Sequence, residues 1–141
     1  MSPKDNKVLV QRFIHEVMNS GKIAAVAEFC VAGSAFAGGI EGQVRAMRTA
    51  FPDLHMSIDE IFAEGNKIAV RVTVRGTNTG PLVGLPAFGR LETAVPPTGK
   101  SVTGSAMYVF RASDGKIFSL AAEIDQIGLL QQLGWTFTPP A

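Results

Sequence analysis

The sequence predicts an α+β fold in which helices come first and an antiparallel sheet follows. Apolar residues recur with a helical period as far as Pro52, and beyond it they alternate with polar residues. Two turn dipeptides, Gly65-Asn66 and Asp114-Gly115, divide the alternating part into two long hairpins. Helices that precede such a sheet bury their apolar faces against one side of it.

The first helix is expected to begin at Ser2-Pro3 and to run to about Asn19. Serine is a favoured N-cap, and proline is tolerated in the first turn because its missing N–H has no partner there. The apolar residues of this segment fall on one helical face: Val8, Leu9, Phe13, Ile14, Val17 and Met18.

Two further helices are expected before the sheet. A short one covers residues 23–29, after the Ser20-Gly21 break, and a glycine-rich connection covers residues 31–39. The next helix is expected from about Ile40, with Val44, Met47 and Phe51 on its inner face, and Pro52 ends it.

Four strands are expected, at residues 54–64, 67–77, 101–111 and 116–124, followed by a short closing helix that starts near Asp125. Residues 80–100 form a long segment rich in Pro and Gly, which we expect to be a loop that serves as a lid, a binding edge or an interface. Its larger apolar residues are Leu82, Val83, Leu85, Phe88, Leu91 and Val95.

Composition predicts one globular domain over residues 1–141, because 46% of the residues are hydrophobic and 18% are charged. The formal charge is +1 and no basic run occurs, which argues against nucleic acid as a partner. With no apolar signal core and no membrane-length apolar run, we expect a cytoplasmic protein that does not enter a membrane. Metal-ligand spacing and nucleotide-binding motifs are missing from the sequence as well.

Five short motifs indicate a family. The segments FPDL, GTNTG, PPTGKSV, DGKI and DQIGLLQQLG occur in this order between Phe51 and Gly134. In these segments the chain resembles the SnoaL-like polyketide cyclases of the NTF2-like superfamily, with an apparent insertion at residues 87–95. The resemblance implies an NTF2-like cone, in which a strongly bent antiparallel sheet wraps around three N-terminal helices and encloses a small-molecule pocket.

The resemblance also implies a chemistry. The best-known members close a polyketide ring by intramolecular aldol condensation without a metal or cofactor, and they assemble as dimers or tetramers. They place a histidine and an acid two residues apart on the last strand, where one group transfers a proton between carbon and oxygen. The matching positions here are Leu120 and Ala122, so we expect a pocket without this pair.

Three other residues are candidates for catalysis: Tyr108, Asp125 and Glu123. Tyr108 alternates with Ala106 and Phe110 and is expected to face the pocket, where its phenol either stabilises an enolate oxygen or is an ordinary buried hydroxyl. Asp125 matches the family pattern, but its position also predicts a helix N-cap. Glu123 falls on the opposite face of its strand and reaches the pocket only if a bulge intervenes.

The pocket lining follows from the same periodicities. The helices are expected to contribute four residues and the strands eight, all on the inner faces of their elements. They are Phe13, Met18, Met47, Phe51, Val70, Val72, Ala106, Phe110, Phe118, Leu120, Ala122 and Ile124.

Two classes of function fit these expectations. In the first, the protein is a cofactor-independent enzyme of the cyclase or isomerase kind, acting on an apolar small molecule. In the second, the same pocket is a carrier site, or the long loop binds a protein partner, and nothing is transformed. A cone filled by its own side chains would be a third, structural role.

Overall fold

The helices of the structure, a computed structural model that describes residues 2–85 and 89–141, come before the sheet as expected. They are α1 (Pro3–Phe13), α2 (Val26–Phe29) and α3 (Ala35–Ala50), and α4 (Gln126–Gln132) closes the chain after the sheet. The π-helix η1 (Ile14–Asn19) continues α1, and the 3-10 turn η2 (Ile23–Ala25) leads into α2. Within the described ranges, no helix is long and apolar enough to cross a membrane.

The start of α1 confirms the predicted cap. The Asp5 backbone N–H donates to Ser2 Oγ at 3.2 Å, and the Ser2 N–H donates to Asp5 Oδ2 at 3.1 Å, which is a complete capping box. These bonds favour the ionised form and lower the pKa of Asp5. The helical segment ends at Asn19 as predicted, but its last six residues have the wider π geometry.

The third helix begins five residues earlier than predicted, at Ala35. Ser34 is its N-cap, with Oγ accepting from the Ala37 N–H at 3.1 Å. The expectation of a glycine-rich connection over residues 31–39 was therefore wrong for its second half. Gly38 and Gly39 are poor helix formers, but the cap and the burial of Ala37 and Ile40 outweigh their low propensity.

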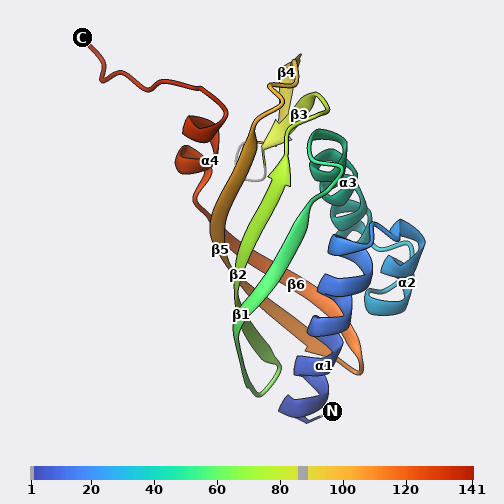
Figure 1. Cartoon of the computed structure of the whole chain (residues 1–141). Coiled ribbons are helices and arrows are strands. Elements are labelled where there is room, and N and C mark those ends of the chain that lie inside the picture. Colours follow the sequence, from blue (N-terminus) through green and yellow to red (C-terminus); the bar gives the residue numbers. More distant parts are fainter. Residues whose placement is uncertain (1, 86–88) are drawn as a thin grey trace.

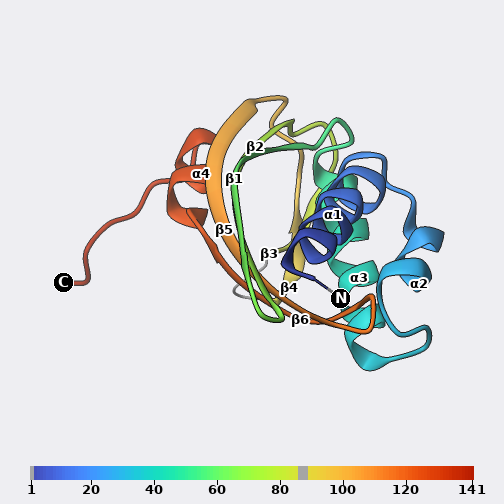
Figure 2. The same ribbon diagram turned by 90° about the horizontal axis from the view of Figure 1, so that it is seen from below.

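Four antiparallel strands form one curved sheet in the order β1-β2-β5-β6, and its concave face holds α1 and α3 (Figures 1 and 2). The strands are β1 (His55–Glu64), β2 (Lys67–Thr77), β5 (Ser101–Ser113) and β6 (Lys116–Ile124). Both predicted hairpin turns are present: Gly65, Asp114 and Gly115 have φ of 57°, 51° and 75°. This left-handed conformation is the reason that Gly and Asp occur there.

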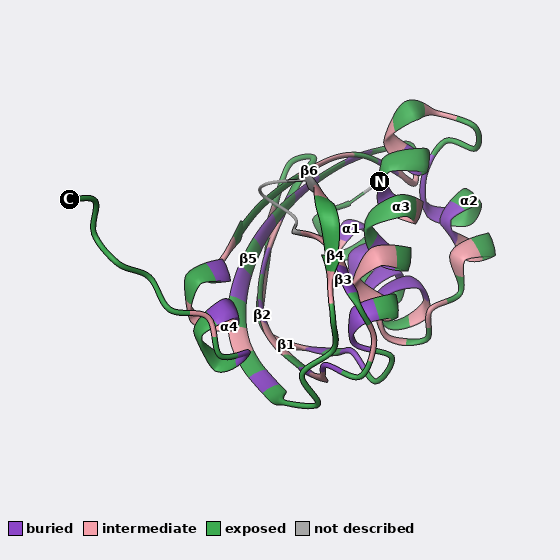
Figure 3. Cartoon of the chain, turned by 90° about the horizontal axis from the view of Figure 1, so that it is seen from above, coloured by how far each residue is buried: buried purple, intermediate pink, exposed green. Residues whose placement is uncertain are grey.

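The predicted long loop contains a second, two-stranded sheet. Within residues 80–100, β3 (Leu82–Leu85) pairs with β4 (Gly89–Val95), and Phe88 lies outside the described residues. Figures 2 and 3 show this hairpin between β5 and α3, and Leu82 is packed against Ala50 and Phe51 at the end of α3. The hairpin therefore covers the upper part of the concave face.

Buried residues gather where the helices meet the concave face of the sheet (Figure 3). Phe13 of α1 makes edge-to-face contacts with Phe29 and Phe110, with ring centroids 5.9 and 5.7 Å apart. A smaller apolar cluster joins the end of α3 to Leu82, Val102 and α4. Two apolar clusters, the main core and this smaller one, thus hold the helical layer to the sheet.

Helix α4 lies beside the upper part of β5 (Figure 1), where β6 no longer pairs with it. Gln132 supplies hydrogen bonds to the backbone at this edge of β5. Its Oε1 accepts from the Thr103 N–H and its Nε2 donates to the Thr103 carbonyl, both at 2.8 Å. The side chain thereby replaces a neighbouring strand and fixes α4 against the sheet.

Arg48, on α3, joins three segments of the chain. Its Nη1 donates to the carbonyls of Met18 and Asn19 at 3.0 Å and of Leu54 at 3.1 Å, and its Nη2 donates to the Pro52 carbonyl at 2.7 Å. Gly21 has φ of 68°, and a Cβ there would lie 2.6 Å from Arg48 Nε. The end of η1, the last turns of α3 and the entry to β1 are therefore held together by one guanidinium.

Replacing Arg48 by methionine should lower the free energy of unfolding by about 2–3 kcal/mol, because four carbonyls lose a charged donor. Arg45→Met is the matched control on the same helix, since the exposed Arg45 side chain makes no ion pair or hydrogen bond to any described residue. Urea unfolding followed by circular dichroism measures both. Equal losses in the two variants would contradict the role given to Arg48.

Candidate functional site

A cavity lies between the helices and the concave face of the sheet, and we call it the main cavity. Its volume is about 330 Å³, within the range of small-molecule sites. It is lined by Phe13 of α1, Met18 of η1, the α3 residues Phe36, Gly39, Ile40, Gln43, Val44 and Met47, Tyr108 of β5, and the β6 residues Leu120, Ala122 and Ile124.

A smaller cavity of about 60 Å³, the side cavity, lies nearer α4 and the β3–β4 hairpin. It is lined by Met47, Phe51, Leu54, Val74, Leu82, Gly84, Val102, Gly104, Ser105, Tyr108, Ile124, Asp125, Gln126 and Leu129. Met47, Tyr108 and Ile124 line both cavities, so the two adjoin at these side chains.

Few polar side chains reach either cavity. The main cavity has Tyr108 and the exposed Gln43, whereas the side cavity has Ser105, Tyr108, Asp125 and Gln126. Tyr108 is thus the polar group common to both. Any ligand of this site would be held mainly by apolar contacts and oriented by a small number of hydrogen bonds.

The Tyr108 side chain is 6% exposed, and its ring lies 6.0 Å from that of Phe110. Burial raises the pKa of Tyr108 to about 12, because the phenolate would lose its hydration. The group is therefore a neutral O–H donor at any physiological pH. Its hydroxyl has no hydrogen-bond partner among the described residues, which leaves it free to bond to a ligand.

Asp125 is the N-cap of α4, as predicted. Its Oδ1 accepts from the Gly128 N–H at 2.9 Å, while its Oδ2 has no partner in the part of the chain that the structure describes. Asp125 also belongs to the lining of the side cavity, together with Tyr108. The Asp125 carboxylate can therefore cap α4 with one oxygen and still be available to a ligand in the side cavity.

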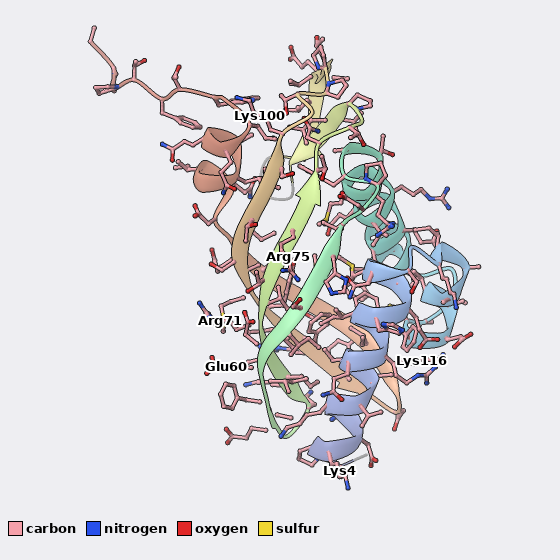
Figure 4. All side chains as sticks on the ribbon, viewed as in Figure 1. Lys4, Glu60, Arg71, Arg75, Lys100 and Lys116 are labelled. Carbon is pink, nitrogen blue, oxygen red and sulfur yellow. The ribbon has the colours of Figure 1, made fainter. Side chains whose placement is uncertain are left out.

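Glu123 lies outside both cavities. It pairs with Met107 in the sheet and is exposed on the convex face, where it lines a shallow outer hollow with Arg71. Figure 4 shows the Arg71 side chain pointing away from the helical layer. The strand alternation that predicted this orientation of Glu123 holds at this point of β6.

The structure brings part of the expected lining together. Phe13, Met18, Leu120 and Ala122 line the main cavity, Phe51 lines the side cavity, and Met47 and Ile124 line both.

Five expected lining residues lie elsewhere. Val70, Val72 and Phe110 are buried in the packed core because α1 and η1 lie directly on that part of the sheet. Ala106 is also buried, and it borders the outer hollow near Glu123 rather than either cavity. Phe118 is 46% exposed: β5 and β6 pair Arg111 with Ser119 and Ala112 with Ile117, so Phe118 is an extra, outward residue and Ile117 is buried instead.

Several lining residues were missed. Phe36, Gly39 and Ile40 were overlooked because α3 was expected to start too late, although Ile40, Val44 and Met47 have helical spacing. Gln126 was overlooked because it directly follows a helix cap, where a polar residue is ordinary. No group of His, Cys, Asp and Glu side chains suited to a metal ion occurs within residues 2–85 and 89–141.

Comparison with known proteins gives one family and several similar structures. The family model of the SnoaL-like polyketide cyclases matches residues 8–133. A SnoaL-like polyketide cyclase, described as putative, from Jannaschia sp. CCS1 superposes with a TM-score of 0.78 at 19% identity, covering 99% of this chain and 98% of that one. No curated protein sequence matches this chain.

Two further solved structures show the same fold. A putative polyketide cyclase from Acidithiobacillus ferrooxidans has a TM-score of 0.73 and 23% identity, covering 95% of this chain and 98% of that one. AclR, a putative hydroxylase from Streptomyces galilaeus, has a TM-score of 0.76 and 23% identity, covering 99% of this chain and 87% of that one.

The single tyrosine of the chain makes its titration directly observable, by the ultraviolet absorbance of phenolate. The midpoint should lie near pH 12 in the folded protein and near pH 10 in urea. Because folding raises the pKa of Tyr108, the protein keeps its full free energy of unfolding below pH 10. That free energy falls as the pH rises toward 12, by up to about 2–3 kcal/mol.

Tyr108→Phe serves as the control, since it should lack this loss of stability. A folded-state midpoint near pH 10 would show that the phenol is solvated.

Proposed function

Because the chain belongs to the SnoaL-like polyketide cyclase family, we propose that it is an enzyme acting on an apolar small molecule in the main cavity. The reaction is of the cyclase or isomerase kind: it passes through an enolate and needs no cofactor. The substrate is a ketone carried on a ring system or a folded chain. The volume of about 330 Å³ and the apolar lining support a ligand of this class.

The observation that carries the proposal is the free hydroxyl of Tyr108 in an apolar cavity. An O–H donor in a site of low polarity stabilises the negative charge that develops on a carbonyl oxygen more strongly than water does. Since the pKa of Tyr108 is raised to about 12, the phenol keeps its proton and acts by hydrogen bonding. Tyr108 is the polar group most enclosed among those of the main cavity.

The proton transfer is assigned to Asp125. Its carboxylate takes the proton from the carbon next to the ketone, and the enolate oxygen forms while Tyr108 donates to it. In ring closure, the enolate carbon then attacks a second carbonyl, and the new alkoxide receives the proton from Asp125. In isomerisation, the same proton returns to another carbon of the substrate.

Leu120 and Ala122 limit the chemistry of this site. They occupy the positions where the resemblance predicts a histidine and an acid, and both line the main cavity with apolar side chains. The rate must then depend more on holding the substrate in a reactive conformation, which the walls of the cavity supply. We therefore assign proton transfer to the side cavity, whose lining includes both Asp125 and Tyr108.

The same apolar lining favours a second candidate, a carrier that binds the molecule without transforming it. The two functions differ in whether protons next to the ketone exchange with solvent. A bicyclic ketone such as tetralone, incubated with the protein in deuterated water, reports this step before the natural substrate is known.

Tyr108→Phe should slow deuterium exchange into tetralone by about 10²–10³-fold, because the enolate loses its donor. Mass spectrometry of the recovered ketone measures the rate, and binding of tetralone should change much less than the rate. Binding by the wild-type protein without exchange above the buffer rate would contradict the enzyme and favour the carrier.

Asp125→Asn should abolish most of the exchange while leaving the protein folded. Asparagine is as good an N-cap as aspartate, so α4 keeps its cap while the base is lost. Glu123→Gln is the matched control on the convex face and should exchange tetralone at the wild-type rate. Exchange that is lost in Glu123→Gln and kept in Asp125→Asn would reverse the assignment of the base.

A further inference from the structure

The side cavity contains a polar group that the proposed reaction does not use. Gln126 is 9% exposed, and its Oε1 is fully buried without a hydrogen-bond partner among the residues that the structure describes. No hydrogen bond involving Nε2 is present in that part of the chain either. Gln126 is the first residue of α4, and it lines the side cavity together with Asp125 and Leu129.

No hydrogen bond to a described residue accounts for a carboxamide in this place. Buried amides are nearly always hydrogen-bonded, because removing them from water without a partner destabilises the fold. Leu129 and Leu130, on the same helix, show that apolar side chains are accommodated there. The carboxamide of Gln132, on the same helix, differs from that of Gln126 because it makes two hydrogen bonds to Thr103.

The dimensions of the site indicate what the partner of Gln126 is. About 60 Å³ is too small for a whole ligand, but it holds a substituent of a molecule whose body occupies the main cavity. Met47, Tyr108 and Ile124 form the boundary between the cavities. A group that passes this boundary enters the side cavity, which Gln126 lines.

Resting on the proposed function, we propose that Gln126 is a specificity-determining residue that binds a hydroxyl substituent on the apolar ring system of the substrate. Oε1 is an acceptor, so its partner is a donor. If the carboxamide rotates by half a turn, it presents the Nε2 donor instead. A hydroxyl can bond to either orientation because it both donates and accepts, whereas an ether oxygen can only accept. The substrate class is therefore a hydroxylated ring ketone rather than a plain or O-alkylated one.

The test compares two probes, a naphthol and its methyl ether, which differ in the hydroxyl proton and one methyl group. Isothermal titration calorimetry should show that the wild-type protein binds the naphthol about tenfold or more tightly than the ether. In Gln126→Met, which keeps the side-chain length, the two affinities should become similar. Glu123→Gln, on the convex face and outside both cavities, is the control, and its preference for the naphthol should persist.

Stability separates this role from a structural one. Gln126→Met should unfold at the same urea concentration as the wild type or at a higher one, since an unpartnered amide is removed. Lower stability with an unchanged naphthol preference would overturn the inference, and so would failure of the wild type to bind the naphthol. A preference that depends on Gln126, found without any exchange of tetralone, would uphold the hydroxyl site and refute the enzyme.

Discussion

The hydrogen bonds of Arg48 are the interaction on which the site depends most. One guanidinium donates to four carbonyls and so fixes η1, α3 and the start of β1 relative to each other. Met18 and Met47, next to these bonds in η1 and α3, line the main cavity. A cavity between helices and sheet would otherwise tend to collapse, because apolar surfaces pack closely when they are free to move. Charged hydrogen bonds to backbone therefore maintain an apolar space.

The polar side chains that line this space differ between its two cavities. Tyr108 and Gln43 line the main cavity, whereas Ser105, Asp125 and Gln126 line the side cavity together with Tyr108. Helix α4 is kept there by the Gln132–Thr103 bonds at the free edge of β5. We therefore assign recognition of shape to the helical layer, and proton transfer and hydroxyl recognition to the end of the sheet near α4.

The sequence predicted the sheet and the helical layer well, because helical spacing, strict alternation and Gly or Asp at left-handed turn positions are local signals. It predicted the site less well. Phe118 was assigned inward, because a one-residue register shift between β5 and β6 leaves no mark in the alternation. Val70, Val72 and Phe110 have the same pattern as lining residues, and only the path of α1 and η1 across the sheet decides that they are packed. Gln126 follows a helix cap, so nothing local reveals that its carboxamide is buried without a partner.

The most direct test of the role given to Tyr108 is the crystal structure of the protein with tetralone bound. We expect the rings to occupy the main cavity and the ketone oxygen to lie within hydrogen-bond distance of Tyr108 Oη, about 2.5–3.0 Å. We also expect the carbon bearing the exchangeable protons to face Asp125. A ligand in the main cavity with its ketone turned toward Gln43 and solvent, or a ligand bound only on the convex face, would contradict the central claim that the free phenol of Tyr108 organises the site.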